Sequence, residues 1–337
     1  MLHALVQSTF GFGVVRALLG IGEAGNFPTA IKTVAEWFPK KERALATGIF
    51  NSGTNIGAIV APAIVPWIAV KYGWQQAFLW TGAIGFIWLL CWWRFYQVPS
   101  QHKKLSAEEY AYIHSDDEPV LQATQRTPWL TLFGYRQTWA IIFGKLLTDP
   151  IWWFFLFWLP SYFSSVFHLS SEALGKPLIV IYSAAMVGSI GGGYLSSYLI
   201  QRGSKVFFAR KLSLFIFACC VVPVVLANNN ANLWQVVALI SLASAAHQAW
   251  SANVYTLASD MFPKYAVSSV AGIGGMAGSV GGIIFPIVVG LLLDHYKVLG
   301  DISAGYRILF VICASMYLLA WGLVHVCAPK MEMVKGI

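Results

Sequence analysis

One pattern of residues occurs twice in this chain of 337 residues, and the two copies are 224 positions apart. The offset holds for a phenylalanine–proline–lysine triplet (262 − 38 = 224), and also for two glycines, a proline and a tyrosine. The copies are Phe38, Pro39, Lys40, Gly48, Gly57, Pro62, Tyr72 and Phe262, Pro263, Lys264, Gly272, Gly281, Pro286, Tyr296. Both lie in apolar helical patterns. Two related apolar halves are typical of transporters, whose substrate site lies between the halves near the middle of the bilayer.

The composition is that of a protein that crosses a membrane. Hydrophobic residues make up 58% of the chain and charged residues only 11%, whereas soluble domains carry about 25% charged residues. A helix needs roughly 20 apolar residues to cross a bilayer core of about 30 Å. Nine stretches qualify, at 9–37, 45–70, 75–97, 137–166, 175–201, 209–228, 232–259, 267–293 and 303–328. They are too long for barrel strands, so we expect an all-α membrane protein.

The repeat also divides the chain into parts. About three apolar spans, starting near Gln137, precede the second copy, and the equivalent start in the first half would be residue 137 − 224 = −87. We therefore expect nine of twelve transmembrane helices, with the first three missing from this sequence. The expected parts are a partial N-terminal half of three helices (1–98), a cytoplasmic linker (99–136) and a C-terminal half of six helices (137–337). In the linker, Ser106 followed by two glutamates predicts the start of a short surface helix.

The distribution of lysine and arginine predicts the orientation of the chain. If the segments between spans alternate between two sides, the side with the C-terminus carries 15 of these residues and the other side carries 4. Because cytoplasmic loops are rich in Lys and Arg, we expect a multi-pass protein of the cell's inner (plasma) membrane with a cytoplasmic C-terminus. The same bias accounts for the net charge of +8, so no nucleic-acid partner need be invoked.

Two charged residues, Arg16 and Glu23, lie seven positions apart on one face of the first span. Burying an ion in a membrane is expensive, so such residues usually face a cavity and mark a pathway or a proton relay. A guanidinium suits recognition of a carboxylate, which favours Arg16 as a substrate-binding residue. A desolvated carboxylate can take up and release protons near neutral pH, which favours Glu23 as a proton-coupling residue. The alternative is an ion pair that only holds helices together.

A second charged pair, Lys145 and Asp149, lies four positions apart just before Pro150. The pair is either a local salt bridge at a helix end or part of the cavity, with Lys145 contacting an anionic substrate and Asp149 coupling protons. The proline should loosen the helix there, and discontinuous helices are typical of transporter binding sites. Of the aromatic side chains that follow, we expect Trp152 to line the cavity and the others to pack against helices or lipid.

Polar residues within otherwise apolar spans give the remaining candidates. His247 corresponds to Glu23 under the offset of 224, so the two side chains should face each other across the cavity. Trp250 and Asn253 share the helix face of His247. Asn51 and Asn55 lie four positions apart in the second span, where their amides can bind hydroxyl groups of a substrate. The substrate-binding candidates in this group are His247, Trp250, Asn253, Asn51 and Asn55. The alternative for His247 is a hydrogen bond that only joins two helices.

The sequence indicates no metal or enzyme chemistry. The five cysteines lack metal-ligand spacing and lie in or beside apolar spans, which favours a structural role. The glycine-rich stretches 188–193 and 272–282 lack the preceding strand that phosphate-binding motifs require, so close helix packing explains them better. The spans contain no nucleophile–base pair. We expect no metal, no cofactor beyond a proton as coupling ion, and no enzymatic activity.

Several segments resemble the major facilitator superfamily. The segments Arg16–Gly25 and Glu36–Gly48 resemble its fourth and fifth helices, and more closely those of the anion:cation symporter branch, which includes hexuronate and D-galactonate transporters. The segments 149–160 and 259–264 resemble the seventh helix and the segment after the tenth in hexuronate-type members. The resemblance covers nearly the whole chain, from the end of the family's third helix to its twelfth.

This resemblance implies proton-coupled uptake of an organic anion by alternating access in a major facilitator-type helix bundle. It implies that Arg16 is a substrate-associated arginine and Glu23 a protonatable glutamate. It also implies that Lys145 replaces a substrate-binding glutamine and that Trp250 belongs to the cavity. Ser197 stands where the superfamily's gating motif often has aspartate, which would weaken a cytoplasmic gate.

We therefore expect a monomeric secondary active transporter whose partners are the lipid bilayer and a small organic anion. Two cationic side chains that face one cavity need an anion to offset their desolvation. Asp149 would partly neutralise Lys145, which favours a monoanion, such as the sugar monocarboxylate of a hexuronate. The alternative function is that of a non-transporting membrane protein or sensor that retains the fold.

Overall fold

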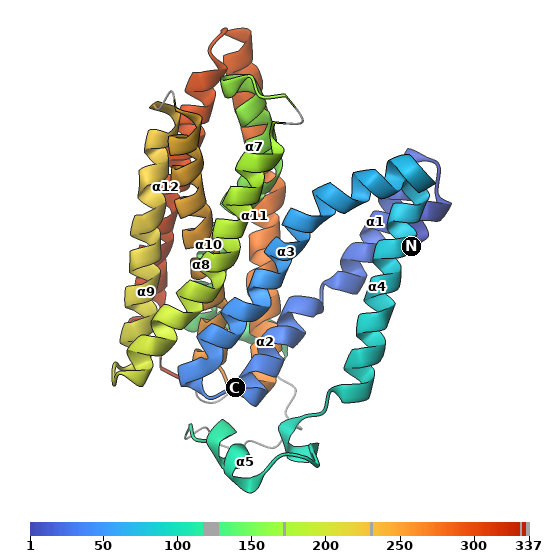
Figure 1. The fold of residues 1–337 in the computed structure, drawn as a ribbon. Helices are drawn as coiled ribbons and strands as arrows, with labels where there is room; N and C mark the ends of the chain where they lie inside the picture. The colour runs from blue at the N-terminus through green and yellow to red at the C-terminus, as the bar shows by residue number, and fades with distance from the viewer. Residues whose placement is uncertain (117–127, 171–172, 230–231, 331, 335–337) are drawn as a thin grey trace.

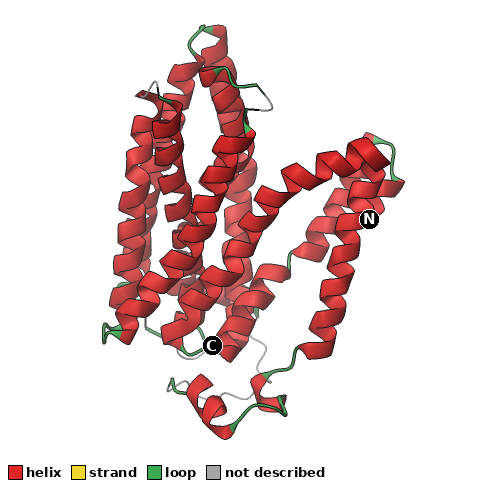
Figure 2. Cartoon of the chain, in the orientation of Figure 1, coloured by secondary structure: helices red, strands yellow, loops and turns green. Residues whose placement is uncertain are grey.

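The computed structural model describes residues 1–337 apart from 117–127, 171–172, 230–231, 331 and 335–337, and all regular secondary structure in these described residues is helical (Figure 2). The α-helices are α1 Thr9–Glu23, α2 Asn26–Trp37, α3 Lys40–Tyr72, α4 Trp74–Phe95, α5 Ala107–Ile113, α6 Arg136–Leu146, α7 Asp149–Phe167, α8 Gly175–Gln201, α9 Val206–Val221, α10 Leu233–Met261, α11 Lys264–Val298 and α12 Ile302–Cys327. The 3-10 helices are η1 Leu2–Leu5, η2 Pro99–Gln101, η3 Trp129–Gly134 and η4 Val222–Asn229.

Most of this helical structure is apolar enough to cross a bilayer. Within the described residues, six segments qualify by length and composition: Trp74–Phe95, Arg136–Phe167, Gly175–Gln201, Val206–Asn229, Lys264–Val298 and Ile302–Cys327. Helix α3 is a seventh if its two parts, Lys40–Ala61 and Ile64–Tyr72, which are bent by 43°, form one broken span. The expected spans at 9–37 and 232–259 are helical but do not meet the same criterion. The first is divided between two helices, and the second carries polar side chains along its length.

Two of the expected spans are interrupted, and a proline follows each interruption. The first span is divided between α1 and α2, and Pro28 lies in the first turn of α2. The fourth is divided between α6 and α7, and Pro150 lies in the first turn of α7. Proline has no backbone N–H, so the first turn is the part of a helix that accommodates it. The expected loosening of the helix at Pro150 is confirmed.

Helix α8 contacts both α3 and α10 along much of its length. Its glycines permit this close approach. A Cβ atom at Gly193 would meet the backbone of Ala44 on α3, and a Cβ atom at Gly192 would meet Ala249 on α10. Small residues let helix backbones approach each other in membranes, where van der Waals packing drives association. The expectation that the stretch 188–193 serves helix packing is confirmed.

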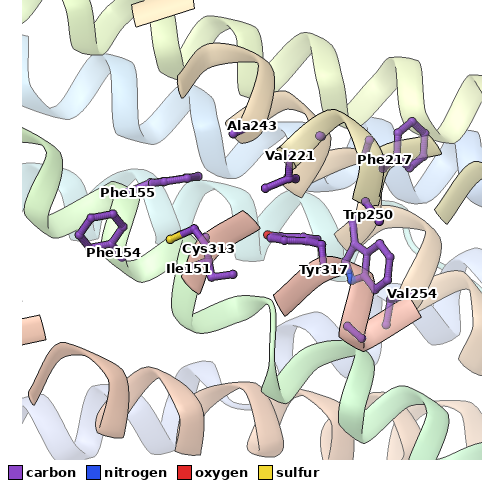
Figure 3. Packing of buried hydrophobic residues seen from close by; sticks show 14 of the residues in the cluster. Ile151, Phe154, Phe155, Phe217, Val221, Ala243, Trp250, Val254, Cys313 and Tyr317 are labelled. Atoms are coloured by element: carbon purple, nitrogen blue, oxygen red, sulfur yellow. The ribbon is translucent and has the colours of Figure 1, made fainter. Parts of the chain in front are cut away.

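The largest apolar core lies among the helices that follow the linker (Figure 3). Its buried members include Phe154 and Phe155 of α7, Val221 of α9 and Tyr317 of α12. Helix α4, in contrast, exposes a series of large apolar side chains, as a helix does when lipid covers it. The packed part of the molecule that positions a site is therefore mainly the part after the linker, together with α2 and α3.

The helices before and after the linker meet at one end of the bundle and diverge toward the other end (Figure 1). We call the end where they meet the basic end, and define it by Arg43 on α3 and Arg210 on α9. Arg43 donates a hydrogen bond to the carbonyl of Ser259 on α10 (2.6 Å). Arg210 donates to the carbonyl of Lys40 on α3 (2.9 Å). Each arginine thus joins the two groups of helices directly.

The carboxylate that pairs with Arg210 comes from α10 and not from the gating-motif position. Asp260 accepts a hydrogen bond from Arg210 Nε at 2.8 Å, and the hydroxyl of Ser196 accepts one from Nη1 at 2.7 Å. The neighbouring Ser197 is buried, and its hydroxyl has no partner within the described part of the chain. Every nitrogen of Arg210 thus has a hydrogen bond although position 197 is a serine.

The linker contains the short helix that Ser106 predicts. The Ser106 hydroxyl accepts a hydrogen bond from the Glu109 backbone N–H at 3.1 Å at the start of α5, so this prediction is confirmed. The linker docks on the beginning of α3 through Asp116, whose carboxylate accepts a hydrogen bond from the Lys40 backbone N–H at 2.6 Å. The linker therefore lies at the basic end.

Candidate substrate site

A cavity of about 820 Å³ lies between the helices before and after the linker. Residues of α1, α2, α3, α6, α7, α10 and α11 line it, so both groups of helices contribute. Of the ten residues that the sequence singled out, the six that line the cavity are Glu23, Asn51, Lys145, Asp149, Trp152 and His247. Binding pockets for small ligands usually measure about 300–1,000 Å³, so the cavity has the size of a small-molecule site.

Lys145 is the cationic group of the cavity. Its side chain is only 3% exposed, and its Nζ lies 2.9 Å from Oδ1 of Asp149. The same Nζ lies 4.0 Å from the centre of the Tyr255 ring and donates a long hydrogen bond of 3.4 Å to the Ser251 hydroxyl. Lys145 and Asp149 form the local salt bridge of the first alternative, and both also line the cavity. The break between α6 and α7 places the pair at a helix end.

Glu23 is the last residue of α1, directly at the break before α2. Its side chain is exposed and lines the cavity. Among the described residues it has no hydrogen bond or ion pair. The carboxylate is therefore open to the contents of the cavity, in contrast to Asp149, which is held by Lys145.

His247 is buried on α10 between two aromatic residues from other helices. A hydrogen bond of 2.5 Å joins its Nδ1 to the hydroxyl of Tyr317 on α12. The indole of Trp152 on α7 stacks on the imidazole, with ring centres 5.2 Å apart and an angle of 3° between the planes. His247 therefore joins helices through Tyr317 and also lines the cavity beside Trp152. Glu23 and His247, which the repeat makes equivalent, both belong to the lining.

Amide side chains from α3 and α10 form a hydrogen-bonded group at the cavity wall. Asn51 donates to the Gln248 side-chain carbonyl at 2.7 Å and to the Ser189 hydroxyl at 3.1 Å. Gln248 in turn donates to the side-chain carbonyl of Asn55 at 3.1 Å. Asn51 and Gln248 line the cavity, whereas Asn55 lies behind them and is fully buried.

Three of the sequence candidates pack inside the protein instead of lining the cavity. Trp250 is fully buried against Tyr317 (Figure 3), and its Nε1 donates to the carbonyl of Gly144 at 3.1 Å. Asn253 is also fully buried and donates to the carbonyl of Gly192 on α8 at 3.0 Å. Asn55 reaches the cavity only through Gln248. These contacts are those of residues that join helices.

Arg16 also lies outside the cavity lining. It is exposed on α1, and in the part of the chain that the structure describes it has no hydrogen bond or ion pair. The expectation was that Arg16 and Lys145 would both face the cavity. The structure differs because α1 ends at Glu23, and seven residues of helix place Arg16 about 10 Å farther along the axis.

On α10, three lining residues were not predicted from the sequence. Ser251 and Tyr255, one and two turns after the predicted His247, line the cavity, and Gln248 lines it beside them. Their spacing of four residues forms one stripe on the helix face. The expected stripe through Trp250 and Asn253 follows a spacing of three residues and lies on the flank that packs against α6 and α8. The signal for the correct stripe was the pair of hydroxyl groups one and two turns after His247.

No metal site accompanies this cavity in the described ranges. No group of three or more His, Cys, Asp or Glu side chains there is placed to hold a metal ion. The described lining residues supply one ammonium, two carboxylates, an imidazole, amides, hydroxyls and aromatic rings.

Relatives of known function share most of this chain. It is 33% identical over 320 residues to the hexuronate transporter of Escherichia coli strain K12, an alignment that covers 94% of this chain and 72% of that protein. It is 38% identical over 213 residues to the galacturonate transporter of Dickeya chrysanthemi, covering 62% of this chain and 61% of the relative. A D-galactonate transporter of Escherichia coli O6:H1 is 30% identical over 295 residues, covering 84% of this chain and 67% of the relative.

Solved structures and a family comparison agree on the fold. The proton:xylose symporter XylE matches with a TM-score of 0.68 at 16% identity, covering 92% of this chain and 69% of XylE. A bacterial homologue of the human lysosomal transporter Spinster matches with a TM-score of 0.56 at 16% identity, covering 99% and 81%. Residues 1–286 match the model of the Major Facilitator Superfamily. The chain belongs to the Major Facilitator Superfamily and is a multi-pass membrane protein.

Proposed function

We propose that this protein is a secondary active transporter that couples uptake of a sugar acid, such as a hexuronate, to inward movement of a proton. The protein acts as a monomer in the inner membrane, with its C-terminus in the cytoplasm and no cofactor other than the coupling proton. Relatives of this chain are named as transporters of hexuronate, galacturonate and galactonate, which are all sugar acids.

The net charge of the cavity lining supports the proposed coupling of substrate uptake to proton movement. Among the described residues that line it, two carboxylates, Glu23 and Asp149, stand against one ammonium, Lys145. An anion that binds beside Lys145 brings a further negative charge into a site that already has one in excess. A proton on Glu23 removes that excess, so anion binding and protonation favour each other. Such coupling is reciprocal by thermodynamic linkage.

The remaining lining residues suit the hydroxylated body of a sugar acid. Amides and hydroxyls come from Asn51, Thr54, Gln248 and Ser251. Polar side chains of this kind fix the orientation of a ligand in a pocket whose walls are mostly apolar. The ring of Trp152 offers a flat apolar surface to one face of the substrate. Lys145 alone supplies the cationic contact in this proposal, because Arg16 lies outside the cavity.

Alternating access requires that the cavity be closed on one side. The basic end is closed by Arg43 and Arg210, which bond across the two groups of helices. With the basic end in the cytoplasm, the arrangement is outward-facing, and uptake requires these bonds to break. Domain rocking around a central site is the general mechanism of such transporters.

The test is transport in proteoliposomes with D-galacturonate and D-glucuronate as substrates. An inward proton gradient should drive accumulation of at least one of them, and the neutral parent sugar should not accumulate. Glu23→Gln should lower gradient-driven accumulation at least tenfold and leave substrate exchange measurable, because the neutral amide mimics the protonated state. Glu36→Gln is the matched control, because Glu36 pairs with Lys32 and does not line the cavity.

Two outcomes would contradict the proposal. Unchanged gradient-driven accumulation in Glu23→Gln would remove Glu23 from proton coupling. Equal uptake of the uronate and of its neutral parent sugar would remove the anion site. A loss of accumulation in Glu36→Gln as large as in Glu23→Gln would show that the effect does not come from the cavity.

A further inference from the structure

The amide group at the cavity wall joins the two groups of helices. Asn51 and Asn55 come from α3, before the linker, and Gln248 comes from α10, after it. Gln248 uses both ends of its amide: its carbonyl accepts from Asn51 at 2.7 Å, and its NH₂ donates to Asn55 at 3.1 Å. One side chain therefore holds two bonds across the boundary at which the halves must separate during transport.

The position of this amide group connects it with the substrate site. Asn51 and Gln248 line the cavity, and both are less than 5% exposed. Close by on the same two sides of the boundary, Phe27 of α2 stacks on Tyr255 of α10, with ring centres 5.3 Å apart. The bonds of Gln248 thus lie in the wall of the cavity, on the boundary between the two groups of helices.

The amide group is also incomplete. Asn55 is fully buried, and its Nδ2 has no hydrogen-bond partner in the described part of the chain. A buried polar group without a partner is costly, and it costs less once a new acceptor arrives. The group therefore holds one unused donor, which lies behind the bond from Gln248 and can reach a new acceptor once that bond opens.

We propose that Gln248 determines the substrate specificity of the cavity. Its bonds to Asn51 and Asn55 keep the basic end closed until hydroxyl groups of the substrate replace them. The proposal rests on the proposed function and names the class of substrate more closely: a carboxylic acid with several hydroxyl groups. A hydroxyl both donates and accepts, so it can satisfy the Gln248 carbonyl and an asparagine NH₂ in turn. A carboxylate only accepts, and an acid without hydroxyls leaves the Gln248 carbonyl unpaired.

The conformational part of the proposal is tested without any ligand. Spin labels at Val70→Cys on α3 and Val298→Cys on α11 report the width of the open end, because both positions are exposed and lie at the helix ends away from the basic end. The exposed Cys91 and Cys219 are replaced first. Gln248→Met keeps the length of the side chain and removes both bonds. We expect the population with a short label-to-label distance to rise by about tenfold, from the loss of two hydrogen bonds.

A second variant and a control make this test independent of folding defects. Asn55→Leu should shift the distances in the same direction, and the double variant should shift them no farther than Gln248→Met alone, because the two residues share one bond. Ser279→Ala is the control, since Ser279 lines the cavity and bonds only within its own helix. Distances in Gln248→Met that equal those of the unsubstituted pair overturn the proposal, and so do additive effects of the two variants.

The substrate part uses D-galacturonate and hexanoate, which have the same number of carbons. In the labelled protein, galacturonate should raise the short-distance population and hexanoate should not, although both carry one carboxylate. In Gln248→Met the difference between the two acids should disappear. An equal response to both acids in the unsubstituted pair overturns the specificity role. If neither acid changes the distances while Gln248→Met does, the proposed function fails for this substrate and the role of Gln248 as an inter-half contact stands.

Discussion

The buried arginines at the basic end and the buried lysine in the cavity differ in how many short hydrogen bonds they make to other protein groups. Arg210 uses all three of its nitrogens, on Asp260, on the Ser196 hydroxyl and on the Lys40 carbonyl. Lys145 has one short contact, to Asp149, and otherwise a long hydrogen bond and the face of an aromatic ring. Both side chains are at most 3% exposed.

This difference separates structural from functional charges. Each nitrogen of Arg210 bonds to another protein group inside the closed end, outside the cavity lining, and the buried Asp260 depends on Arg210 as its cationic partner. A lysine with three donors and only one short contact can donate to another oxygen without losing its existing partner. Buried charge alone therefore does not mark a substrate site; incomplete bonding beside a cavity does.

The largest effect should come from removing Arg210, which pairs with the buried Asp260. Arg210→Met leaves Asp260 buried without its cation, and Asp260 Oδ1 already lacks a partner within the described residues. Removing one partner of a buried ion pair costs about 3–5 kcal/mol of stability. We expect a strongly lowered thermal midpoint of the purified protein in detergent.

Two further variants decide whether this loss has the stated cause. Arg202→Met should leave the thermal midpoint nearly unchanged, since Arg202 is exposed on the same side of the protein and stacks on Tyr198. Arg210→Met combined with Asp260→Asn should recover part of the stability, because no unpaired carboxylate remains. A thermal midpoint of Arg210→Met close to that of Arg202→Met would break the comparison between the two regions.

Lys145→Met should have the opposite profile, with a large loss of binding and a smaller loss of stability. A hydrogen bond to a charged group contributes about 1.5–3 kcal/mol, so the affinity for a uronate should fall roughly 10- to 100-fold. Asp149 is 17% exposed to the cavity, so water can solvate it when its partner is gone. Affinity is measured by isothermal titration with D-galacturonate, and stability by thermal unfolding.

Lys176→Met is the matched control for Lys145→Met. Lys176 is an exposed lysine at the start of α8 and does not line the cavity. Its removal should change neither affinity nor stability. If Lys145→Met destabilised the protein as much as Arg210→Met while binding uronate normally, Lys145 would belong with the structural charges.

The sequence predicted most of the helices and the weak point at Pro150, because both depend on local properties. Hydropathy and length mark most spans, and Pro150 marks one of the two divided spans. The site was harder to predict because it depends on which face of each helix meets the cavity. On α10 a spacing of three residues and a spacing of four differ by about 100° of rotation. That difference separates Trp250, which packs in the core, from Ser251, which lines the cavity.

Which charged residue of a helix lies at the cavity could not be predicted from the sequence either. Arg16 and Glu23 share a face of α1, and only the place where the helix ends decides which of them lies at the cavity. The bonds of Gln248 join α3 and α10, and their partners lie 197 and 193 residues apart in the chain. Neither the spacing of its neighbours nor the internal repeat indicates such a contact, because the repeat relates equivalent positions and not partners.

The smallest effect should come from the surface contacts of the linker, at the same end of the molecule as Arg43. Tyr112 of α5 donates a hydrogen bond to the carboxylate of Glu42, and Lys41 lies over its ring, 4.3 Å from the centre. Tyr112 is 43% exposed, and exposed contacts of this kind usually change stability by no more than about 0.5 kcal/mol. Tyr112→Phe should therefore leave the thermal midpoint nearly unchanged and only loosen α5. Asp116 still anchors the linker to α3 in this variant.

The pH dependence distinguishes this contact from general loosening of the linker. The hydrogen bond to Glu42, and then partial burial, raise the pKa of Tyr112 above its usual value, which is about 10. The contact is therefore complete below about pH 10 and is lost as the pH rises through the higher value in the folded protein. A spin label at Ala111→Cys should be more mobile in Tyr112→Phe than in the tyrosine form at pH 7, and equally mobile at pH values where Tyr112 is ionised. Lys41 is present in both forms, so its own titration cancels in the comparison. Equal mobility at pH 7, or a difference that persists at alkaline pH, would show that the hydroxyl does not hold α5.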